Sequence, residues 1–208
     1  MTAAADLGAG LSKLGLTITK EQQARLIDYL SLLDKWNRVI NLTAIRDPVD
    51  MIAQHLLDSL TLVPHLIGRI NLADVGSGAG LPGIPVAVVR PDMRVALLES
   101  NQKKAAFLRQ AKAELGLDNV EVHAVRAELF KPERLFAVVV SRAFAELDEF
   151  VRLSGHLTAP GGVMLAMKGL YPYEELTRLP ANCSVREVIP LDVPQLDATR
   201  HLVVLETT

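Results

Sequence analysis

The stretch ADVGSGAGLPGIP, residues 73–85, decides the fold class of this chain. A predicted strand ends at its first residues and runs into four glycines, at positions 76, 78, 80 and 83. Glycine allows positive φ angles and lets a ligand lie against bare main chain. The helix predicted to begin within 81–85 adds unpaired N–H groups and the positive end of its dipole. We therefore expect a ligand-binding loop at the carboxyl end of a parallel strand.

Two cofactor classes fit this loop. GAGLPG (78–83) matches the dinucleotide fingerprint, and Glu99 follows about 20 residues later, where a ribose-binding acid is expected. DVGSGAG (74–80) also matches an acidic residue followed by alternating glycines, the pattern of S-adenosylmethionine-dependent methyltransferases. In the dinucleotide fingerprint the first glycine lies close to the strand end, whereas Gly78 lies further on. The pattern therefore favours methyl transfer over hydride transfer.

Around the loop, apolar strand-like runs alternate with helical stretches. Strands are predicted at 70–75, 95–99, 120–124, 136–140 and 163–168, and helices at 84–90, 102–115 and 146–157. Such alternation implies a parallel sheet with helices on both faces. The runs 184–193 and 200–207 have no helix between them, so we expect an antiparallel pair at the sheet edge. The expected fold is α/β, doubly wound and Rossmann-like, with the seven strands of S-adenosylmethionine-dependent methyltransferases.

The first 64 residues are predicted to be mainly helical. Thr19 and Gln22 have capping-box spacing, ahead of an apolar stripe at Leu26, Leu30, Leu33 and Trp36. A second helix is predicted from Pro48, with Asp47 as its N-cap and an apolar stripe at Val49, Ile52, Leu56 and Leu60. We expect an N-terminal helical cap at 1–64 and a methyltransferase domain at 65–208, forming one compact unit.

Composition excludes several classes of protein. The chain has 208 residues, of which 50% are hydrophobic and 22% charged, enough to fill the core of one domain and too apolar for disorder. Apolar runs such as 136–140 fall far short of the roughly 20 residues that span a bilayer. No signal peptide is expected, and the lone Cys183 and the histidine spacing suggest neither disulfide nor zinc site. We expect a cytoplasmic, metal-free protein without a membrane partner.

Charge and aromatic content limit how the chain can bind nucleic acid. Its formal net charge is −2 and its isoelectric point is near 6.2, so no global basic field is expected. Aromatic residues make up only 4% of the chain, which argues against a platform that stacks single-stranded bases. Any contact with nucleic acid is therefore expected to be local.

Several separate segments carry a specific resemblance. These are NLTAIRDP (41–48), HLLDSL (55–60), the loop with its flanks (74–91), LLES (97–100), KKAAFLRQ (103–110) and SRAFAEL (141–147). In order and spacing they resemble the bacterial 16S ribosomal RNA guanine-N7 methyltransferase family, also called the glucose-inhibited division protein B family. The resemblance implies a monomeric enzyme that methylates guanine N7 in the 530-loop region of 16S rRNA, with S-adenosylmethionine as donor. Its partner would be 16S rRNA or the small ribosomal subunit.

Site residues follow partly from chemistry and partly from this resemblance. A carboxylate can accept from both ribose hydroxyls, which assigns Glu99, while Asp74 is expected to orient the loop and the cofactor's amino-acid end. The resemblance adds the first loop glycine, a leucine after the glycines, a pair after the third strand and the SRAF arginine. The predicted cofactor-binding residues are Asp74, Gly76, Gly78, Gly80, Leu81, Glu99, Ala127, Glu128 and Arg142.

The absence of two sequence motifs restricts which atom of the base can accept the methyl group. Pyrimidine C5 methylation needs a nucleophile, usually cysteine, but Cys183 lies elsewhere, between a helix and the predicted sixth strand. Exocyclic amines usually require an Asn/Asp-Pro-Pro-aromatic motif after the fourth strand, where this chain has SRAF (141–144). Guanine N7 has an in-plane lone pair and loses no proton, so alignment with the methyl group suffices. The missing motifs agree with N7.

Four residues are candidates on the substrate side. Arg142 is predicted to be catalytic, pairing with the cofactor carboxylate or donating to guanine O6; the alternative is a salt bridge to a neighbouring helix. His55 and Asp58 share one helix face, where they bind substrate or make structural hydrogen bonds. Lys168 pairs with an RNA phosphate or is a solvated strand end. Two other functions stay open: a nicotinamide-dependent oxidoreductase and a non-catalytic ribosome-assembly factor.

Overall fold

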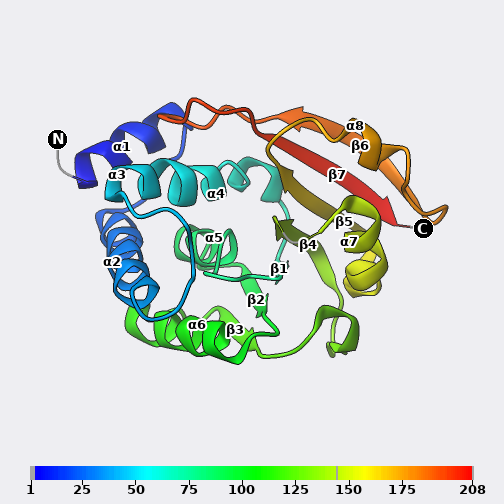
Figure 1. The fold of residues 1–208 in the computed structure, drawn as a ribbon, viewed down its shortest axis with the longest axis horizontal. Helices are drawn as coiled ribbons and strands as arrows, with labels where there is room; N and C mark the ends of the chain where they lie inside the picture. Colours follow the sequence, from blue (N-terminus) through cyan, green and yellow to red (C-terminus); the bar gives the residue numbers. More distant parts are fainter. Residues whose placement is uncertain (1–2, 144, 208) are drawn as a thin grey trace.

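The computed structural model describes residues 3–143 and 145–207, and a seven-stranded sheet forms its centre (Figure 1). The strands lie in the order β3-β2-β1-β4-β5-β7-β6. Their bounds are β1 Asn71–Val75, β2 Arg94–Leu98, β3 Val120–His123, β4 Phe136–Arg142, β5 Thr158–Lys168, β6 Cys183–Pro190 and β7 His201–Thr207. Strands β1 to β5 are parallel, whereas β7 is antiparallel to β5 and to β6. The predicted seven-stranded α/β fold with its antiparallel hairpin is confirmed.

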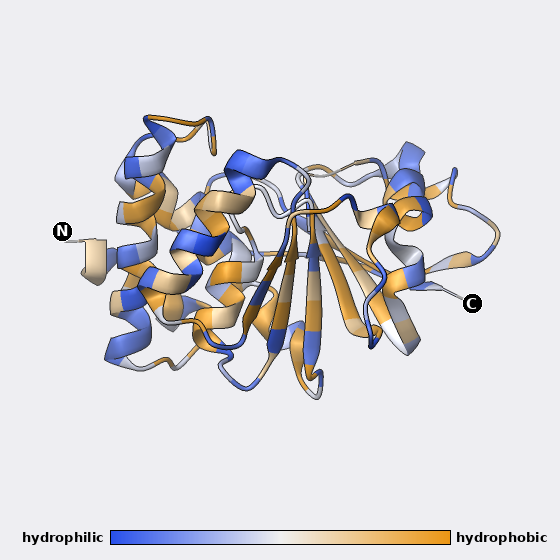
Figure 2. Ribbon diagram, turned by 90° about the horizontal axis from the view of Figure 1, so that it is seen from below, coloured by the Kyte–Doolittle hydropathy of each residue, from blue (hydrophilic) through white to orange (hydrophobic). Residues whose placement is uncertain are grey.

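Helices cover both faces of this sheet, which Figure 2 shows as a fan of strands between two groups of helices. The α-helices are α1 Ala3–Lys13, α2 Lys20–Asn37, α3 Pro48–Met51, α4 Asp58–Leu60, α5 Gly83–Val89, α6 Gln102–Leu115, α7 Leu147–Ser154 and α8 Tyr173–Leu176. One π-helix, η1 Ile52–Leu57, joins α3 to α4, and the 3₁₀ segments are η2 Val63–Leu66, η3 Ala127–Leu129 and η4 Gly155–Leu157. Within the described ranges, no helix is both long and apolar enough to cross a membrane.

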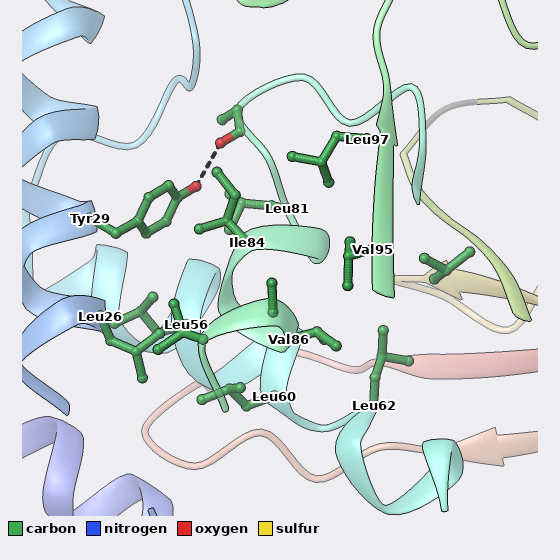
Figure 3. Close-up of a cluster of buried hydrophobic side chains, with 14 of the residues drawn as sticks. Leu26, Tyr29, Leu56, Leu60, Leu62, Leu81, Ile84, Val86, Val95 and Leu97 are labelled. Carbon is green, nitrogen blue, oxygen red and sulfur yellow. Dashed lines mark hydrogen bonds between the residues drawn. The ribbon is translucent and has the colours of Figure 1, made fainter. Parts of the chain in front are cut away.

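The two faces of the sheet bury two separate apolar cores. Successive strand residues point to opposite faces, so Leu72 of β1 enters the core beneath the N-terminal helices while Ala73 enters the core beneath α7. Figure 3 shows part of the first core, to which α2 contributes Leu26, η1 contributes Leu56 and α5 contributes Ile84. The N-terminal helices are therefore part of the main core and hold the loop that precedes α5.

The N-terminal helices largely follow the sequence prediction. Thr19 and Gln22 form the predicted capping box at the start of α2, and Asp47 caps α3. The second predicted helix is not uniform, because it passes through the π-helical η1. Its apolar stripe was wrong at Val49, which is 60% exposed, since the wider π turn shifts the buried face after it. The other stripe positions are buried: Ile52, Leu56 and Leu60.

Several boundaries in the second half differ from the prediction. The strand predicted at 163–168 already begins at Thr158, which pairs with Phe136 of β4. The helix predicted to reach 157 ends at Ser154 and continues as η4. Cys183 is the first residue of β6, opposite Thr207, and does not precede the strand as predicted. None of these shifts moves the carboxyl ends of the parallel strands.

Candidate active site

A cavity of about 510 Å³ opens at the carboxyl edge of the central strands. Its volume falls in the range of about 300–1,000 Å³ that is typical of small-molecule sites. Segments that are distant in the sequence meet there: the α2–α3 connection, η1 and α4, the glycine loop, and the ends of β4 and β5. The lining residues are Leu42, Thr43, Ile45, Gln54, His55, Asp58, Gly76, Ser77, Gly78, Ala79, Leu81, Lys104, Arg142, Ala143, Met167, Lys168, Gly169 and Arg200.

The glycine loop supplies one wall of the cavity as bare backbone. Gly76, Gly78 and Gly80 have φ angles of 69°, 56° and 87°, in the left-handed region that favours glycine. A Cβ at Gly78 would meet only the Gly76 carbonyl, at 3.7 Å, so a side chain there would project into open space. A Cβ at Gly80 would instead lie 2.5 Å from Ile84, and Gly80 does not line the cavity. Gly78 thus leaves room for a ligand and Gly76 also lines the cavity, whereas Gly80 is needed for packing.

Two carboxylates hold this loop from behind. Asp74 is fully buried, and its Oδ2 accepts from the Gly83 N–H at 2.9 Å. Burial raises the pKa of Asp74 to about 7, against the lowering effect of that hydrogen bond. Glu99 accepts from the Gly78 N–H at 2.9 Å and from the Asn101 N–H at 2.7 Å. Each carboxylate therefore fixes the loop through its backbone N–H groups.

A tyrosine from the N-terminal helices fixes the loop from the other side. The Tyr29 hydroxyl, on α2, donates to the Ala79 carbonyl at 2.7 Å, the dashed bond in Figure 3. Tyr29 is fully buried, and its ring lies 6.5 Å from that of Phe107 on α6. Ala79 itself lines the cavity. Helix α2 is thereby coupled to the cavity wall through one hydrogen bond in the apolar core.

A second part of the cavity lining consists of charged side chains. Asp58 on α4 is buried, and its Oδ2 accepts from Arg142 Nη1 at 3.0 Å, while Arg200 Nε lies 3.3 Å from its Oδ1. Arg142 Nη1 also donates to the Gln54 carbonyl at 2.8 Å. The two arginine side chains keep 20% and 23% of their surface exposed. We call Arg142, Asp58 and Arg200 the Arg–Asp–Arg cluster; it presents two guanidinium groups that a single carboxylate holds in place.

The other two substrate-side candidates also line the cavity. His55 is buried, with Nε2 3.0 Å from the Thr43 hydroxyl, and burial lowers the pKa of His55 to about 4. Lys168 donates to Glu175 at 2.7 Å and to the Ala145 carbonyl at 3.0 Å, and only 18% of its side chain is exposed. The alternative that Lys168 is a solvated strand end is therefore wrong. His55 is neutral at neutral pH, whereas Lys168 is a positioned cation.

The structure brings some of the predicted site residues together and leaves others apart. His55, Asp58 and Arg142 line one cavity, together with Gly76, Gly78, Leu81 and Lys168. Asp74, Gly80, Glu99, Ala127 and Glu128 do not line it. Ala127 is buried in η3, and Glu128 lies 3.7 Å from Arg126. Phe144 of the SRAF motif lies outside the described residues.

Sequence reasoning missed three residues at this site. Arg200 lies in the link before β7, and Lys104 lies on the first turn of α6; both line the cavity. Tyr29 supports the loop from α2. Lys104 and Arg200 stand in stretches with other charged residues, so no local pattern marks them. Tyr29 carried a weak signal, because a tyrosine inside an apolar helix face needs a hydrogen-bond partner when it is buried.

The residues present fit S-adenosylmethionine. A Cβ at Gly78 would occupy the open space beside the loop, which suits a ligand lying on the main chain. The Glu99 carboxylate uses two hydrogen-bond positions for backbone N–H groups, and an ionised carboxylate has about four. The exposed edges of Arg142 and Arg200 suit a carboxylate. Gly76, Gly78 and the two arginines, which line the cavity, would together hold the donor.

Several solved structures have a similar fold, an O-methyltransferase among them. The O-methyltransferase TomG from Streptomyces achromogenes has a TM-score of 0.59 at 16% identity, covering 100% of this chain and 99% of its own. TrmN from Thermus thermophilus has a TM-score of 0.54 at 17% identity, covering 76% of this chain and 53% of its own. At such identities the similarity shows the fold alone.

Sequence relatives are much more similar. The ribosomal RNA small subunit methyltransferase G of Nitrosospira multiformis is 55% identical over 213 residues, covering 99% of this chain and 98% of the relative. The protein of the same name from Chromobacterium violaceum is 56% identical over 199 residues, covering 96% and 95%. The GidB family model, described as rRNA small subunit methyltransferase G, matches residues 22–203. This chain therefore belongs to the rRNA small subunit methyltransferase G family.

Proposed function

We propose that this chain transfers the methyl group of S-adenosylmethionine to N7 of a guanine in 16S ribosomal RNA. The observation that carries the proposal is one cavity lined both by bare glycine backbone and by the Arg–Asp–Arg cluster. The relatives' name, ribosomal RNA small subunit methyltransferase G, supports the substrate class. The proposed partner is 16S rRNA or the small ribosomal subunit. We also propose that the protein is a monomer and acts in the cytoplasm.

Local charge supports an RNA substrate. Among the described residues that line the cavity, four carry a positive charge and one, Asp58, is a carboxylate; the cations are Lys104, Arg142, Lys168 and Arg200. This excess exists although the whole chain has a formal net charge of −2. Phosphate groups near the target base would meet this cationic rim. These cations support the proposal that the expected local contact with nucleic acid is made at this cavity.

The cofactor supplies a methyl group on a positively charged sulfur. The glycine loop binds the donor through its main chain, and Glu99 is proposed to accept from the ribose hydroxyls. Asp74 fixes the loop from beneath through Gly83. Because Asp58 and Gln54 take bonds from one nitrogen of Arg142, the other guanidinium N–H groups can donate to a ligand. The chain thus orients the donor with groups that its own contacts already hold.

Methylation at guanine N7 needs no side chain that removes a proton from the substrate. The lone pair of N7 lies in the ring plane, and no proton leaves when the methyl group arrives. Asp58 is paired with two arginines, and burial lowers the pKa of His55 to about 4, which makes its imidazole a weak base for removing a proton. Holding N7 in line with the methyl group can supply about 7–11 kcal/mol of the barrier. Positioning is therefore the main task of this cavity.

The product identifies the reaction. Purified protein and labelled S-adenosylmethionine should be incubated with deproteinised 16S rRNA, with small subunits and with tRNA. We expect label in one guanine of the ribosomal RNA, and cleavage there by borohydride and aniline, because N7 methylation leaves a labile, positively charged ring. Label in 5-methylcytosine or N6-methyladenine contradicts the N7 assignment. Thermal stabilisation by NADH and not by S-adenosylhomocysteine would instead support the oxidoreductase alternative.

Variants of Arg142 test its catalytic role. Arg142→Ala should lose about 100-fold or more in methyl transfer, the size of removing one preorganised donor from an active site. Arg142→Lys should stay impaired, because lysine lacks the planar fork. Weaker binding of S-adenosylhomocysteine assigns Arg142 to the cofactor carboxylate; intact binding with lost turnover assigns it to guanine O6. If the Ala variant melts early but keeps full activity per folded molecule, its salt bridge to Asp58 is its whole role.

A further inference from the structure

Three aromatic rings gather on the surface after β5. Tyr171 is 37% exposed and Tyr173 is 75% exposed. Their ring centroids lie 4.3 Å apart, and the His201 ring meets Tyr171 edge-on at 5.5 Å. The chain has three tyrosines in all, and the third, Tyr29, is buried in the core. We call Tyr171, Tyr173 and His201 the tyrosine platform.

The tyrosine platform borders the candidate active site. Strand β5 ends at Lys168, which lies opposite His201 at the start of β7. Gly169 and Arg200, which adjoin these two residues in the chain, both line the cavity. The tyrosine platform therefore lies at the same carboxyl edge of the sheet as the cavity. It adjoins Arg200, a member of the Arg–Asp–Arg cluster.

Hydrogen bonds hold the segment that carries the tyrosine platform. A ring nitrogen of His201 lies 3.0 Å from the Gly169 carbonyl. The Glu175 carboxylate, on α8, accepts from Lys168 at 2.7 Å and from the Leu147 N–H at 2.8 Å. The Tyr173 N–H donates to the Tyr171 carbonyl at 3.0 Å. The rings are therefore presented by a segment that is anchored at both ends.

An exposed tyrosine pair beside a cationic rim suits one class of ligand. The Tyr173 ring faces Tyr171 on one side and keeps most of its surface exposed. Flat bases stack on aromatic rings in single-stranded RNA, and nearby cations meet the phosphates. Lys168, Arg142 and Arg200 provide such cations on the adjoining wall. An apolar protein segment would need a larger uncharged surface than two rings offer.

We propose that Tyr173 stacks on an unpaired base of the RNA next to the target guanine, with Tyr171 supporting its ring from behind. The proposal rests on the proposed function in taking ribosomal RNA as the substrate. It adds how the neighbouring nucleotide is held while the target base enters the cavity, since base-modifying enzymes act on single-stranded or flipped-out nucleotides. The low aromatic content of the whole chain argued against base stacking, whereas this proposal assigns base stacking to two exposed tyrosines in one segment.

Direct binding and turnover test this role separately. Filter binding of an unstructured single-stranded oligoribonucleotide should be about 5- to 150-fold weaker for Tyr173→Ala, the range measured for loss of one base–aromatic stack. With 16S rRNA as substrate, KM should rise by a similar factor while kcat stays within about twofold. Tyr173→Phe keeps the ring and should bind like the wild type. Affinity for S-adenosylhomocysteine should not change in either variant.

Leu170→Ala is the matched control, because Leu170 is 80% exposed in the same segment and has no ring. It should leave RNA binding within about twofold. Unchanged RNA binding by Tyr173→Ala overturns the proposal, as does an equal loss in Tyr173→Phe, which would assign the effect to the hydroxyl. The binding assay needs no turnover, so it decides on Tyr173 even if the wild type methylates no ribosomal RNA; that result would count against the proposed function alone.

Discussion

The two walls of the cavity are built by opposite means. The glycine wall is uncharged main chain, fixed by buried hydrogen bonds to Asp74, Glu99 and Tyr29. The cationic wall consists of side chains, in which Asp58 holds Arg142 and Arg200 by charge. The conformation of the glycine loop is fixed by core packing. The positions of the two arginine side chains depend instead on their shared carboxylate partner, Asp58. We therefore expect the cationic wall to be the more sensitive to single substitutions.

Asp58→Asn should have the largest effect. It keeps the size of the side chain but leaves two partly buried guanidinium groups without their counter-charge. Breaking a buried pair in this way costs about 3 kcal/mol, so the free energy of unfolding in urea should fall by about that amount and methyl transfer should be nearly lost. Asp50→Asn, at an exposed site on α3, should change stability by no more than about 0.5 kcal/mol. Equal stability of the two variants would contradict the ionic account of this wall.

Gly83→Ala tests the glycine wall. A Cβ at Gly83 would lie 2.8 Å from Asp74 Oδ2 and would overlap the Leu97 side chain. Overpacking of this kind costs about 1–3 kcal/mol, and we expect weaker S-adenosylhomocysteine binding in calorimetric titration because Asp74 must move. Gly8→Ala in α1 meets nothing within 4 Å and should gain roughly 0.5–1 kcal/mol. A Gly83→Ala protein as stable as the wild type would show that the loop yields more easily than its contacts suggest.

Two buried groups at the site, Asp74 behind the glycine loop and His55 in the cavity lining, have pKa values that are shifted in opposite directions. The folded-state pKa of Asp74 is raised from 3.8 to about 7, so its contribution to stability is full below 3.8 and is lost as pH rises through 7. The folded-state pKa of His55 is lowered from 6.5 to about 4, so its contribution is present above 6.5 and is lost as pH falls through 4.

Urea unfolding between pH 4 and 7 separates these contributions. The stability of the wild type relative to Asp74→Asn should fall as pH rises across this range. Relative to His55→Gln, it should rise as pH goes from 4 to 6.5. The raised pKa has desolvation as its main cause, so an Asp74→Asn difference that stays flat with pH would mean that water reaches Asp74.

Tyr29→Phe should have the smallest effect. The ring remains in the core, but the Ala79 carbonyl loses its donor, which costs about 1 kcal/mol. Because Ala79 lines the cavity, the affinity for S-adenosylhomocysteine should fall with stability. Thermal unfolding with and without the ligand measures both. A drop in stability with unchanged ligand affinity would mean that α2 supports the fold without tuning the glycine wall.

The sequence predicts the glycine wall well because its determinants are local. The strand, the glycines and the following helix lie within residues 71–89, and the periodicity of the chain predicted the sheet around them. The family resemblance, read from separate short segments, is confirmed by the match over residues 22–203. The roles proposed for single residues remain predictions.

The cationic wall was only partly predictable because its members come from distant segments. Asp58, Arg142 and Arg200 belong to α4, to the end of β4 and to the link before β7. Only the strand order, with β7 next to β5, brings Arg200 to the site, and no local pattern encodes that order. The same limit applies to the tyrosine platform, since composition counts aromatic residues without locating them.

The position of β7 has a consequence for the order in which the two walls arise during translation. Among the described strands β7 is synthesised last, yet it lies between β5 and β6. A nascent chain therefore contains the whole glycine loop before Arg200 has been added, since synthesis runs from the N-terminal end. Until β7 inserts, Asp58 has one arginine partner instead of two. The second arginine therefore joins the cationic wall only with the last of the described strands.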